Sequence, residues 1–528
     1  MIQIGNIKLS LDGDEKKLYS RAARVLGISP KEIKNLKIAK KAVDARDKRD
    51  VHFVFSVELE VEGSEEKLLK RVSRRDITIK PKEETVPTAT PRIPEKRPIV
   101  VGAGPAGLFA ALTLARYGAN PILIERGETV EDRAKSIRAF HESGKLNSES
   151  NVQFGEGGAG TFSDGKLNSG THDKRRFDVF STFVRHGAPS EIMYIRNPHI
   201  GSDNLPKVVS GIREEIKSLG GEVFFNTRLC DIHTKNGNLC GITCKSGDKE
   251  VSFETDKLIL AVGHSARDVF ELLARMGVTL EQKPFSMGVR IEHLQRDIDR
   301  CRYGDFAGHP ALGAADYKLS NRLLNGRCVY TFCMCPGGEV INASSEEGGI
   351  VTNGMSLYAR NKDNANSALL VNVAPEDFGG SHPLAGVYMQ REIEKAAFAL
   401  AGENYSAPAQ TVEGFLTGKK TGFGKIKPSF LPGVAECNIA ELFPEYITET
   451  LKAGLKNFSG SIRAFSDGEA VLTAPETRSS SPVRIMRNEN LVSSLGGLYP
   501  CGEGAGYAGG ILSSAVDGIR VAEALLEI

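Results

Sequence analysis

A glycine pattern near residue 100 constrains this chain more than any other feature. Gly102, Gly104 and Gly107 follow the apolar run 98–101, and a second apolar stretch, 108–115, comes next. In a strand–turn–helix unit, such glycines allow a tight turn, a close approach of backbone to pyrophosphate, and close packing of helix on strand. The free N–H groups and the dipole at the helix start favour the phosphate charge. The pattern therefore predicts a dinucleotide-binding unit.

An acidic residue at the end of the next apolar strand supports this prediction. Residues 122–124 are apolar and lead into Glu125. An acid about 20 residues after the glycine turn can accept hydrogen bonds from the ribose hydroxyls of the adenosine half. A turn with only a structural role would need neither this order of elements nor the acid. We therefore expect nucleotide binding, and the first motif alone fits either NAD or FAD.

Length and composition bound the class of protein. The 528 residues are too many for one hydrophobic core, and 40% apolar with 25% charged residues is ordinary for a globular protein. No apolar run reaches the ~18 residues that span a bilayer, and the N-terminus lacks the pattern of a signal peptide. Nine scattered cysteines favour reduced thiols. We expect a cytoplasmic protein with no membrane partner.

The N-terminal region predicts a small α+β domain at residues 1–85. Residues 15–26 have helical spacing, and residues 51–61 alternate as a half-buried strand does. The stretch 82–94 is rich in Pro and Thr and has no periodicity, which predicts an interdomain linker at about 86–96.

Beyond the linker, glycine-dense segments alternate with apolar strands. A block at 151–166 is dense in glycine, and the last forty residues return to this style before a final helix at 512–526. Between them the patterns predict a helix at 208–219, strands at 222–225 and 257–263, and turns at 236–237 and 246–247. No second Gly-x-Gly-x-x-Gly motif appears between residues 276 and 484.

The C-terminal segment resembles that of FAD-dependent oxidoreductases of the glutathione-reductase type. Glu503, in the glycine-rich run 497–506, matches the acid that these proteins direct to the ribitol of the flavin, and residues 509–513 match the start of the helix that faces the flavin ring. Free N–H groups at a helix start can stabilise negative charge on a reduced flavin.

Longer blocks resemble a bacterial family usually named FAD-dependent or "NAD(FAD)-utilizing" dehydrogenases, most of whose members have no assigned substrate. The resemblance covers nearly the whole chain. It implies an oxidoreductase with FAD as cofactor, and it does not supply the reaction. Its blocks lie at residues 42–46, 154–166, 263–268, 332–338, 352–355, 476–484 and 500–510.

Together, the patterns and the resemblance predict an α/β fold. A discontinuous Rossmann-like FAD-binding domain takes residues 97–275 and 485–528, and an α+β substrate or cap domain at 276–484 is inserted in it. The small basic α+β domain precedes both. The residues expected to contact FAD are Gly102, Gly104, Pro105, Ala106, Gly107, Glu125, Arg126, Arg133, Gly158, Ala159, Gly263, Gly502, Glu503, Gly510 and Ile511.

The catalytic residue is unknown at this point, and four side chains are weak candidates. Cys333 and Cys335 could exchange electrons with the flavin as a thiol pair, although a Cys-x-Cys disulfide closes a strained ring and the two thiols equally suit one packed face of a strand. His199 could be an acid or base, and Arg478 could anchor an anion. His264, which follows a strand-end glycine, is interpreted as structural.

Metal and nucleic-acid partners have less support. No cysteine or histidine cluster has zinc spacing, so no metal is expected. The first 98 residues carry 23 Lys and Arg against 16 Asp and Glu, and Lys31, Lys34 and Lys37 would share a face if helical. No Gly-x-x-Gly clamp or aromatic-rich strand motif accompanies them. A solvated surface is favoured, and an RNA-associated, tRNA-modifying flavoprotein is the rival.

The sequence thus predicts an FAD-dependent oxidoreductase that acts on a small, anionic organic molecule by hydride or two-electron transfer. The missing second dinucleotide motif leaves the electron donor open between the substrate itself, a transiently docked NAD(P)H and a protein.

Overall fold

A computed structural model describes residues 1–69, 72, 74–80, 90–168, 170 and 172–528 of the chain. The chain forms two compact units, which are described separately. The smaller comprises Met1–Thr88, Pro189–Pro198 and Arg296–Ala315, and the larger comprises Ala89–Ala188, His199–Gln295 and Asp316–Ile528. Residues 81–89, which include the first residues of the expected linker at about 86–96, lie outside the described residues.

The smaller unit is a four-stranded antiparallel sheet with strand order β2-β3-β1-β4. The alternating strand β3 buries its apolar positions, as its period of two requires. Helix α1 ends at Gly27, which adopts a left-handed φ of 69°. The bounds are β1 Ile2–Ser10, β2 Ile33–Asp44, β3 His52–Val61, β4 Ile77–Ile79, α1 Lys17–Leu26, α2 Glu65–Leu69 and α8 Gln295–Tyr303.

The lysine-rich segment after α1 is a strand, so the expected shared helical face of Lys31, Lys34 and Lys37 is wrong. Ser29 and Glu32 form a capping box around a single 3₁₀ turn, Pro30–Glu32, and the chain then extends into β2. The spacing of the lysines suggested a helix, but this segment instead pairs with β3. The pairing register is fixed because one face of the half-buried strand is apolar and must face the core.

The larger unit contains a five-stranded parallel sheet with strand order β23-β11-β5-β6-β7. Four of these strands are short and fully buried, which is typical of a sheet covered on both faces. The strands are β5 Ile99–Val101, β6 Ile122–Ile124, β7 Glu222–Phe224, β11 Leu258–Leu260 and β23 Leu498–Pro500. This is the predicted α/β, Rossmann-like arrangement, completed by a strand from the C-terminal end of the chain.

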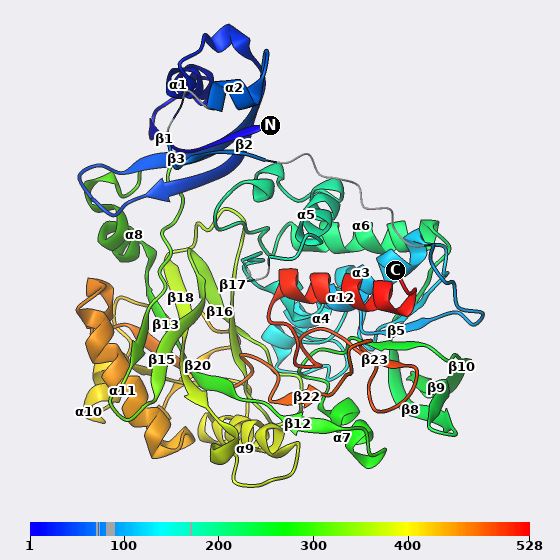
Figure 1. Cartoon of the computed structure of the whole chain (residues 1–528). Coiled ribbons are helices and arrows are strands. Elements are labelled where there is room, and N and C mark those ends of the chain that lie inside the picture. The colour runs from blue at the N-terminus through cyan, green and yellow to red at the C-terminus, as the bar shows by residue number, and fades with distance from the viewer. Residues whose placement is uncertain (70–71, 73, 81–89, 169, 171) are drawn as a thin grey trace. The chain divides into compact units, whose positions relative to one another are not determined.

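Six helices of the described residues belong to this part of the larger unit. Helix α3 is apolar around its whole circumference, and α12 lies against it although about 400 residues separate the two in the chain (Figure 1). The helices are α3 Pro105–Arg116, α4 Val130–Ser143, α5 Arg176–Arg185, α6 Leu205–Ser218, α7 Arg267–Arg275 and α12 Ile511–Leu525. The predicted helices at 208–219 and 512–526 are confirmed within a few residues.

Small antiparallel sheets flank the parallel sheet. The predicted turns at 236–237 and 246–247 connect the hairpins of a three-stranded sheet, β8 Thr227–Lys235, β9 Asn238–Ser246 and β10 Lys249–Glu254. A two-stranded pair joins β12 Leu280–Gln282 to β22 Val483–Ile485. This pair lies where the chain leaves the first part of the dinucleotide-binding region and where it returns.

A seven-stranded mixed sheet forms the rest of the larger unit, with order β14-β15-β18-β13-β21-β19-β20. Its strands are β13 Phe285–Leu294, β14 Ser320–Arg322, β15 Cys328–Cys335, β18 Asn364–Val373, β19 Ala407–Thr411, β20 Val434–Glu436 and β21 Val471–Glu476. The hairpin of β16 Gly338–Asn342 and β17 Thr352–Ser356 accompanies it, with helices α9 Ala385–Leu400, α10 Val412–Thr417 and α11 Glu445–Ser459.

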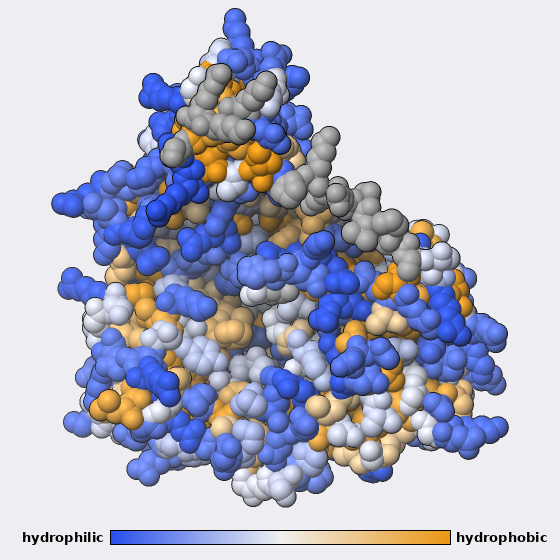
Figure 2. All heavy atoms as spheres, in the orientation of Figure 1, coloured by the Kyte–Doolittle hydropathy of each residue, from blue (hydrophilic) through white to orange (hydrophobic). Residues whose placement is uncertain are grey.

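The surface of the larger unit is mostly hydrophilic on the face drawn in Figure 2, where apolar side chains show as small separate groups. Scattered apolar residues of this kind are normal at a protein surface. Among the described residues, no helix is both long and apolar enough to cross a membrane.

Candidate active-site cavity

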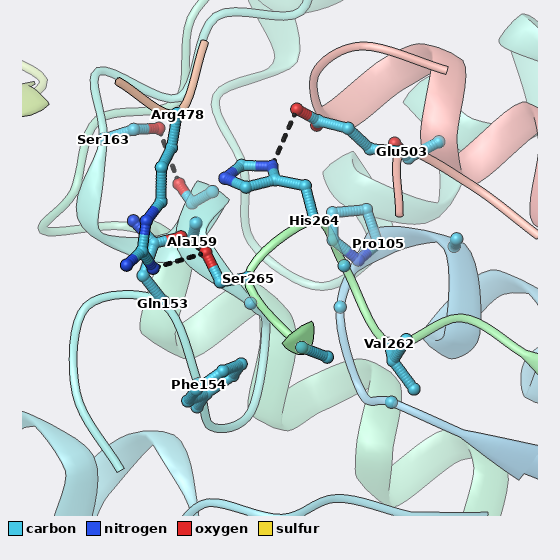
Figure 3. A pocket seen from close by; sticks show the side chains of 18 of the residues that line it. Pro105, Gln153, Phe154, Ala159, Ser163, Val262, His264, Ser265, Arg478 and Glu503 are labelled. Atoms are coloured by element: carbon cyan, nitrogen blue, oxygen red, sulfur yellow. Dashed lines mark hydrogen bonds and ion pairs between the residues drawn. The ribbon is translucent and has the colours of Figure 1, made fainter. Parts of the chain in front are cut away.

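One cavity of the larger unit lies at the carboxyl ends of the parallel strands, where open α/β sheets bind ligands (Figure 3). Two walls face it. The first, here called the cofactor wall, comes from the Gly102 turn, residues 125–126, the segment 153–166, the turn 261–266 and the start of α12. The second, the cap wall, comes from strands β15, β17 and β21 and the segment after β21.

The glycines of the first turn have different physical roles. Gly102 has a φ of 102°, and a Cβ there would lie 2.3 Å from the carbonyl oxygen of Ala261. A Cβ on Gly107 would lie 1.7 Å from the carbonyl oxygen of Gly102, so Gly107 serves helix–strand packing and does not line the cavity. Gly104 lines it, and the nearest atom to a Cβ there is the Cα of Gly158 at 3.9 Å.

The start of α3 offers the cavity its backbone N–H groups. Gly104 precedes the helix without a capping side chain, Pro105 occupies the first turn, and both line the cavity together with Ala106. The first N–H groups of a helix need partners from outside the helix, and an anion can supply them. Gly158, with a φ of 63°, and Ala159 line the same stretch of wall.

Glu125 reaches the cavity from the end of β6, but much of its carboxylate is already engaged. It is 5% exposed and accepts hydrogen bonds from the backbone N–H groups of Ala103 (2.8 Å), Gly127 (2.9 Å) and Gly155 (2.9 Å). A carboxylate has about four acceptor positions. Glu125 therefore organises three loops and retains about one position for a ligand.

Two arginines were expected beside the dinucleotide, and the structure separates them. Arg126 lines the cavity, where Glu149 (2.9 Å) and Asp268 (3.0 Å) hold its guanidinium over the Phe154 ring. Arg133 does not line it.

Arg133 is 0% exposed and donates to four backbone carbonyls, so its expected place beside the dinucleotide is corrected to an internal clamp on the glycine-dense block. Without Arg133, four backbone carbonyls of this buried loop would lack this hydrogen-bond donor, and buried carbonyls need a partner. The acceptors are the carbonyls of Asn151, Val152, Gly155 and Glu156.

The C-terminal residues also divide into lining and packing positions. Gly502 donates its N–H to Asp517 (2.8 Å) and packs on Ala106 without lining the cavity. Glu503, Gly510 and Ile511 line it. Gly510, with a φ of 92°, precedes α12 without a capping side chain, so a second helix start faces the cavity.

His264 is a cavity residue, which corrects its interpretation as purely structural. It follows Gly263, whose side-chain position is open, and its Nδ1 lies 3.1 Å from Glu503 Oε1 (Figure 3). Its Nε2 is buried and has no hydrogen-bond partner among the described residues. Its place directly after a parallel strand was the available signal, but the partner lies 239 residues away.

The charge of Glu503 is stabilised within this pair. Burial alone would raise its pKa, but the hydrogen bond and charge of His264, together with the N–H of Gly510 (3.2 Å), hold the pKa below its usual range. The cofactor wall thus presents two helix starts without capping side chains, glycines with free space beside them, and the unpaired Nε2 of His264. These features fit a ligand with a pyrophosphate and polyol hydroxyls.

Comparison with known proteins agrees with this geometry. The family model of the pyridine nucleotide-disulphide oxidoreductases matches residues 96–285, and a model for the C-terminal domain of FAD-dependent proteins matches residues 284–479. A protein of Clostridium beijerinckii, described as uncharacterized, is 49% identical over 533 residues, which cover 100% of this chain and 98% of that protein. The chain belongs to the FAD-binding pyridine nucleotide-disulphide oxidoreductase family.

Family membership implies FAD as the cofactor and places the protein in the FAD-dependent oxidoreductase superfamily. A domain of unknown function matches residues 1–61. Two solved structures are similar to this chain at low sequence identity. The flavin-dependent brominase Bmp2 is 13% identical, with 82% and 79% of the two chains covered and a TM-score of 0.37. Glycine oxidase from Bacillus cereus is 10% identical, with 82% and 97% covered and a TM-score of 0.31.

On the cap wall, the two candidate cysteines both line the cavity, at a bulge that interrupts β15. The register shifts between Phe332 and Cys335, and Cys333 adopts a φ of 40°, so the expected common face of the two side chains is corrected. Cys333 is exposed where it lines the cavity, whereas Cys335 is buried. Desolvation by the surrounding protein atoms raises the pKa of Cys333 to about 12 and also raises that of Cys335. Both are therefore thiols at neutral pH, the less reactive form.

Arg478 lines the cavity, but its guanidinium is held by protein groups. Glu394, 1% exposed, accepts from Nε (2.9 Å) and Nη2 (2.7 Å), and it also pairs with Arg267 at 2.8 Å. Arg478 Nη1 donates to the hydroxyl of Ser265 (Figure 3) and to that of Ser345. Its guanidinium donors are thus already taken by Glu394 and two hydroxyls, which weakens the case for Arg478 as the anchor of an anionic substrate.

His199 does not line the cavity. Its Nε2 lies 3.0 Å from the carbonyl oxygen of Tyr358, and its ring stacks on the Tyr358 ring with centroids 5.1 Å apart. Burial, followed by the nearby charge of Arg360, lowers its pKa, so the ring is neutral at pH 7. This position corrects the candidate role of His199 as a substrate-facing acid or base.

Lys166 is a cavity residue that the sequence candidates did not include. It ends the glycine-dense block, and its Nζ lies 2.8 Å from Asp164 Oδ2 and donates to the carbonyl oxygen of Met334, between the two cysteines. Arg360 pairs with the same Asp164 from the other side. The end of a block that the family resemblance singled out was the available signal.

Proposed function

We propose that the protein is an FAD-dependent dehydrogenase or reductase that moves a hydride, or two electrons, between FAD and a small, anionic organic molecule. This proposal rests on the cavity and its two walls. The cofactor wall has the helix starts and glycine turns that suit a dinucleotide, and the cap wall opposite has polar side chains. When bound, FAD supplies reversible two-electron chemistry, and the protein supplies position and electrostatics.

Different residues of the cofactor wall would hold different parts of FAD. The start of α3, with Gly102 and Gly104, suits the pyrophosphate, and the remaining acceptor position of Glu125 suits the adenosine ribose. Glu503 and His264 suit the ribitol hydroxyls, since together they offer both an acceptor and an unpaired ring nitrogen. The start of α12, at Gly510, would stabilise negative charge near the flavin ring.

The electron donor is proposed to dock transiently. In the described part of the chain, the five-stranded sheet is the only sheet with three or more parallel strands, so a separate dinucleotide domain of the same kind is not seen there. NAD(P)H, a protein or the substrate itself would then reach the flavin through the shared cavity. All nine cysteines are free in the structure, in keeping with the proposed cytoplasmic location.

Anaerobic rapid mixing of the FAD-loaded protein with NADH, NADPH and a panel of organic acids tests this function. We expect loss of the visible absorption of oxidised flavin with at least one of them. A purified chain that neither contains nor takes up FAD would refute the proposal. Bleaching by an organic acid but by neither nicotinamide would identify the substrate as the donor.

The charge distribution of the smaller unit gives little support to the alternative of an RNA-associated flavoprotein. Lys34, Lys37 and Lys40 are exposed on β2, but acids are interleaved with the cations of this unit. Backbone-tracking RNA sites need an unbroken positive surface. The neutralised pairs are Lys41–Glu15, Arg46–Asp44, Arg49–Asp47 and Lys80–Glu58.

A further inference from the structure

The loop that ends at Lys166 forms a cationic corner of the cavity. Asp164, 3% exposed, lies between the Lys166 ammonium (2.8 Å) and the Arg360 guanidinium, whose Nε lies 3.0 Å away. Burial alone would raise the pKa of Asp164, but these two cations hold it well below its usual range, so the carboxylate stays ionised. One negative charge between two positive ones leaves the corner with a net charge of about +1.

The arginines on or behind the cavity wall are paired with acids. Arg126 and Arg228 share two acids, Glu149 and Asp268. In the cap wall, Glu476 is bidentate with Arg290, at 2.7 and 2.8 Å.

Arg478 pairs with Glu394, and Arg267, which shares this acid, also pairs with Glu346. At the Lys166 corner, by contrast, two cations share the single acid Asp164. An anion that enters the cavity is therefore drawn to this corner.

Hydrogen-bond donors accompany the charge. The ammonium of Lys166 has three N–H groups, of which Asp164 and Met334 take two. Asn353, on β17, also lines the cavity, and its Oδ1 accepts from Arg290 (3.3 Å) and from the N–H of Gly354 (2.8 Å). These contacts orient its amide nitrogen as a donor, which has no hydrogen-bond partner among the described residues. The nearby Cys333 is a thiol and adds no negative charge.

The corner adjoins the place where the flavin ring is expected. The turn Ala159–Phe162 leads directly to Asp164, and a Cβ on Gly160 would lie 2.9 Å from the Ile511 side chain at the start of α12. Lys166 therefore belongs to the same end of the cavity as the α12 start, whereas Arg126 and Glu125 belong to the end of β6.

We propose that Lys166, with Asn353 as a second donor, binds the carboxylate of a small organic acid and so holds the substrate beside the flavin. This inference rests on the proposed oxidoreductase function and replaces Arg478 by Lys166 as the anion anchor. A planar carboxylate uses two donors at once, which suits one ammonium and one amide better than a guanidinium already engaged by Glu394.

Ligand titrations of the FAD-loaded full-length protein test the corner without turnover. Sodium acetate, benzoate and succinate are added, with benzamide as an uncharged analogue and inorganic phosphate as an alternative oxyanion. The visible absorption difference of the bound flavin reports binding. We expect at least one carboxylate to bind, and to bind about tenfold or more tightly than benzamide or phosphate.

Variants assign the effect to the corner. Lys166→Met should weaken carboxylate binding about tenfold or more, Lys166→Arg should retain most of it, and Asn353→Ala should weaken it several-fold. Lys362→Met is the matched control, because Lys362 pairs with Glu339 at 3.2 Å and does not line the cavity. The Arg and Ala variants keep the inference testable if the Met variant folds poorly.

Three results would overturn this inference. They are equal carboxylate affinity in Lys166→Met and wild type, equal affinity for benzoate and benzamide, and preference for phosphate. If the flavin binds and is reduced but carboxylates leave its spectrum unchanged, the carboxylate site fails while the proposed function stands. A protein without FAD would instead refute the proposed function itself.

Discussion

The two walls of the cavity are built on different physical principles. The cofactor wall relies on backbone, with glycines that permit close approach and two helix starts without capping side chains. The cap wall relies on buried side-chain charge, in the pairs Arg290–Glu476 and Arg478–Glu394. A backbone site recognises a charge that many nucleotides share, whereas paired side chains shape a specific pocket.

The difference also concerns what each wall tolerates. In the cofactor wall the limit is steric, because a single added carbon overlaps with main-chain atoms that cannot rotate away. In the cap wall the limit is electrostatic, because the loss of one partner leaves a buried charge without compensation. Substitutions in the two walls should therefore fail in different ways, and this contrast can be measured.

The largest effect on FAD binding is expected from Gly107→Ala, directly behind the cofactor wall. The new Cβ would lie 1.7 Å from the carbonyl oxygen of Gly102. Neither atom belongs to a flexible side chain, so the turn must move, at a cost in the upper part of the range of about 1–3 kcal/mol that overpacking typically has. We expect loss of FAD from the purified protein, measured by absorbance after denaturation. Gly380→Ala, where a Cβ meets nothing within 4 Å, is the control. Retention of FAD by both variants would contradict the steric account.

Glu394→Gln probes the cap wall, and its effect on FAD content should be smaller than that of Gly107→Ala, because it acts through stability. The change leaves the Arg267 and Arg478 guanidinium groups without their shared carboxylate, and breaking a buried pair costs about 3–5 kcal/mol. The shift of the urea midpoint measures it. Glu392→Gln, on the exposed side of the same helix, should move the midpoint little. Equal midpoints for the two variants would show that the buried network contributes nothing.

The difference in stability between wild type and Glu394→Gln should depend on pH, and the pKa of Glu394 sets the direction of this dependence. Burial alone would raise the pKa of Glu394, but the charges of Arg267 and Arg478 lower it below its unfolded value. The stabilisation is therefore fully present above the unfolded pKa, about 4.3, and is lost as the pH falls below it. The difference in stability between wild type and Glu394→Gln should accordingly shrink in acid. A difference that grows in acid would contradict this sign.

The sequence predicted the two walls to different extents, and their construction explains why. The Gly102–Gly107 turn and Glu125 are local in the chain, so their spacing was enough to predict the turn geometry. His264 was misinterpreted because its partner, Glu503, is distant in sequence. Arg133 looked like a ligand contact because no spacing rule indicates that a loop will fold around a guanidinium.

Lys31, Lys34 and Lys37 show the same limit in the smaller unit. Their three-residue spacing suggested a helix, but the decisive partner is strand β3, which follows in the chain and pairs with β2 over its full length. Tertiary pairing overrides local periodicity when the segment also carries β-branched residues, here Ile33, Ile38 and Val43. Glu394 belongs to the same category, because its two guanidinium partners come from separate segments.

A moderate effect is expected from Glu503→Gln, at the meeting point of backbone and side-chain recognition. The amide keeps the shape but removes the charge that pairs with His264. Hydrogen bonds to charged groups contribute about 1.5–3 kcal/mol, so FAD affinity should fall roughly tenfold to a hundredfold. Flavin fluorescence on titration of the apoprotein measures it. Glu527→Gln, at an exposed ion pair with Arg92, is the control. Unchanged affinity in Glu503→Gln would remove the His264–Glu503 pair from the cofactor site.

The smallest effect is expected from Cys333→Ser, which asks whether the cap wall takes part in electron transfer. Desolvation by the surrounding protein atoms raises the pKa of Cys333 to about 12, so the attacking thiolate that disulfide exchange requires is scarce at neutral pH. Anaerobic dithionite titration should therefore take up about two electrons per FAD in wild type and in the variant. Cys301→Ser, at a free cysteine that does not line the cavity, is the control. Two further electrons in wild type that disappear only in Cys333→Ser would instead show that Cys333 and Cys335 form a redox pair, and the cap wall would then share the chemistry of the flavin.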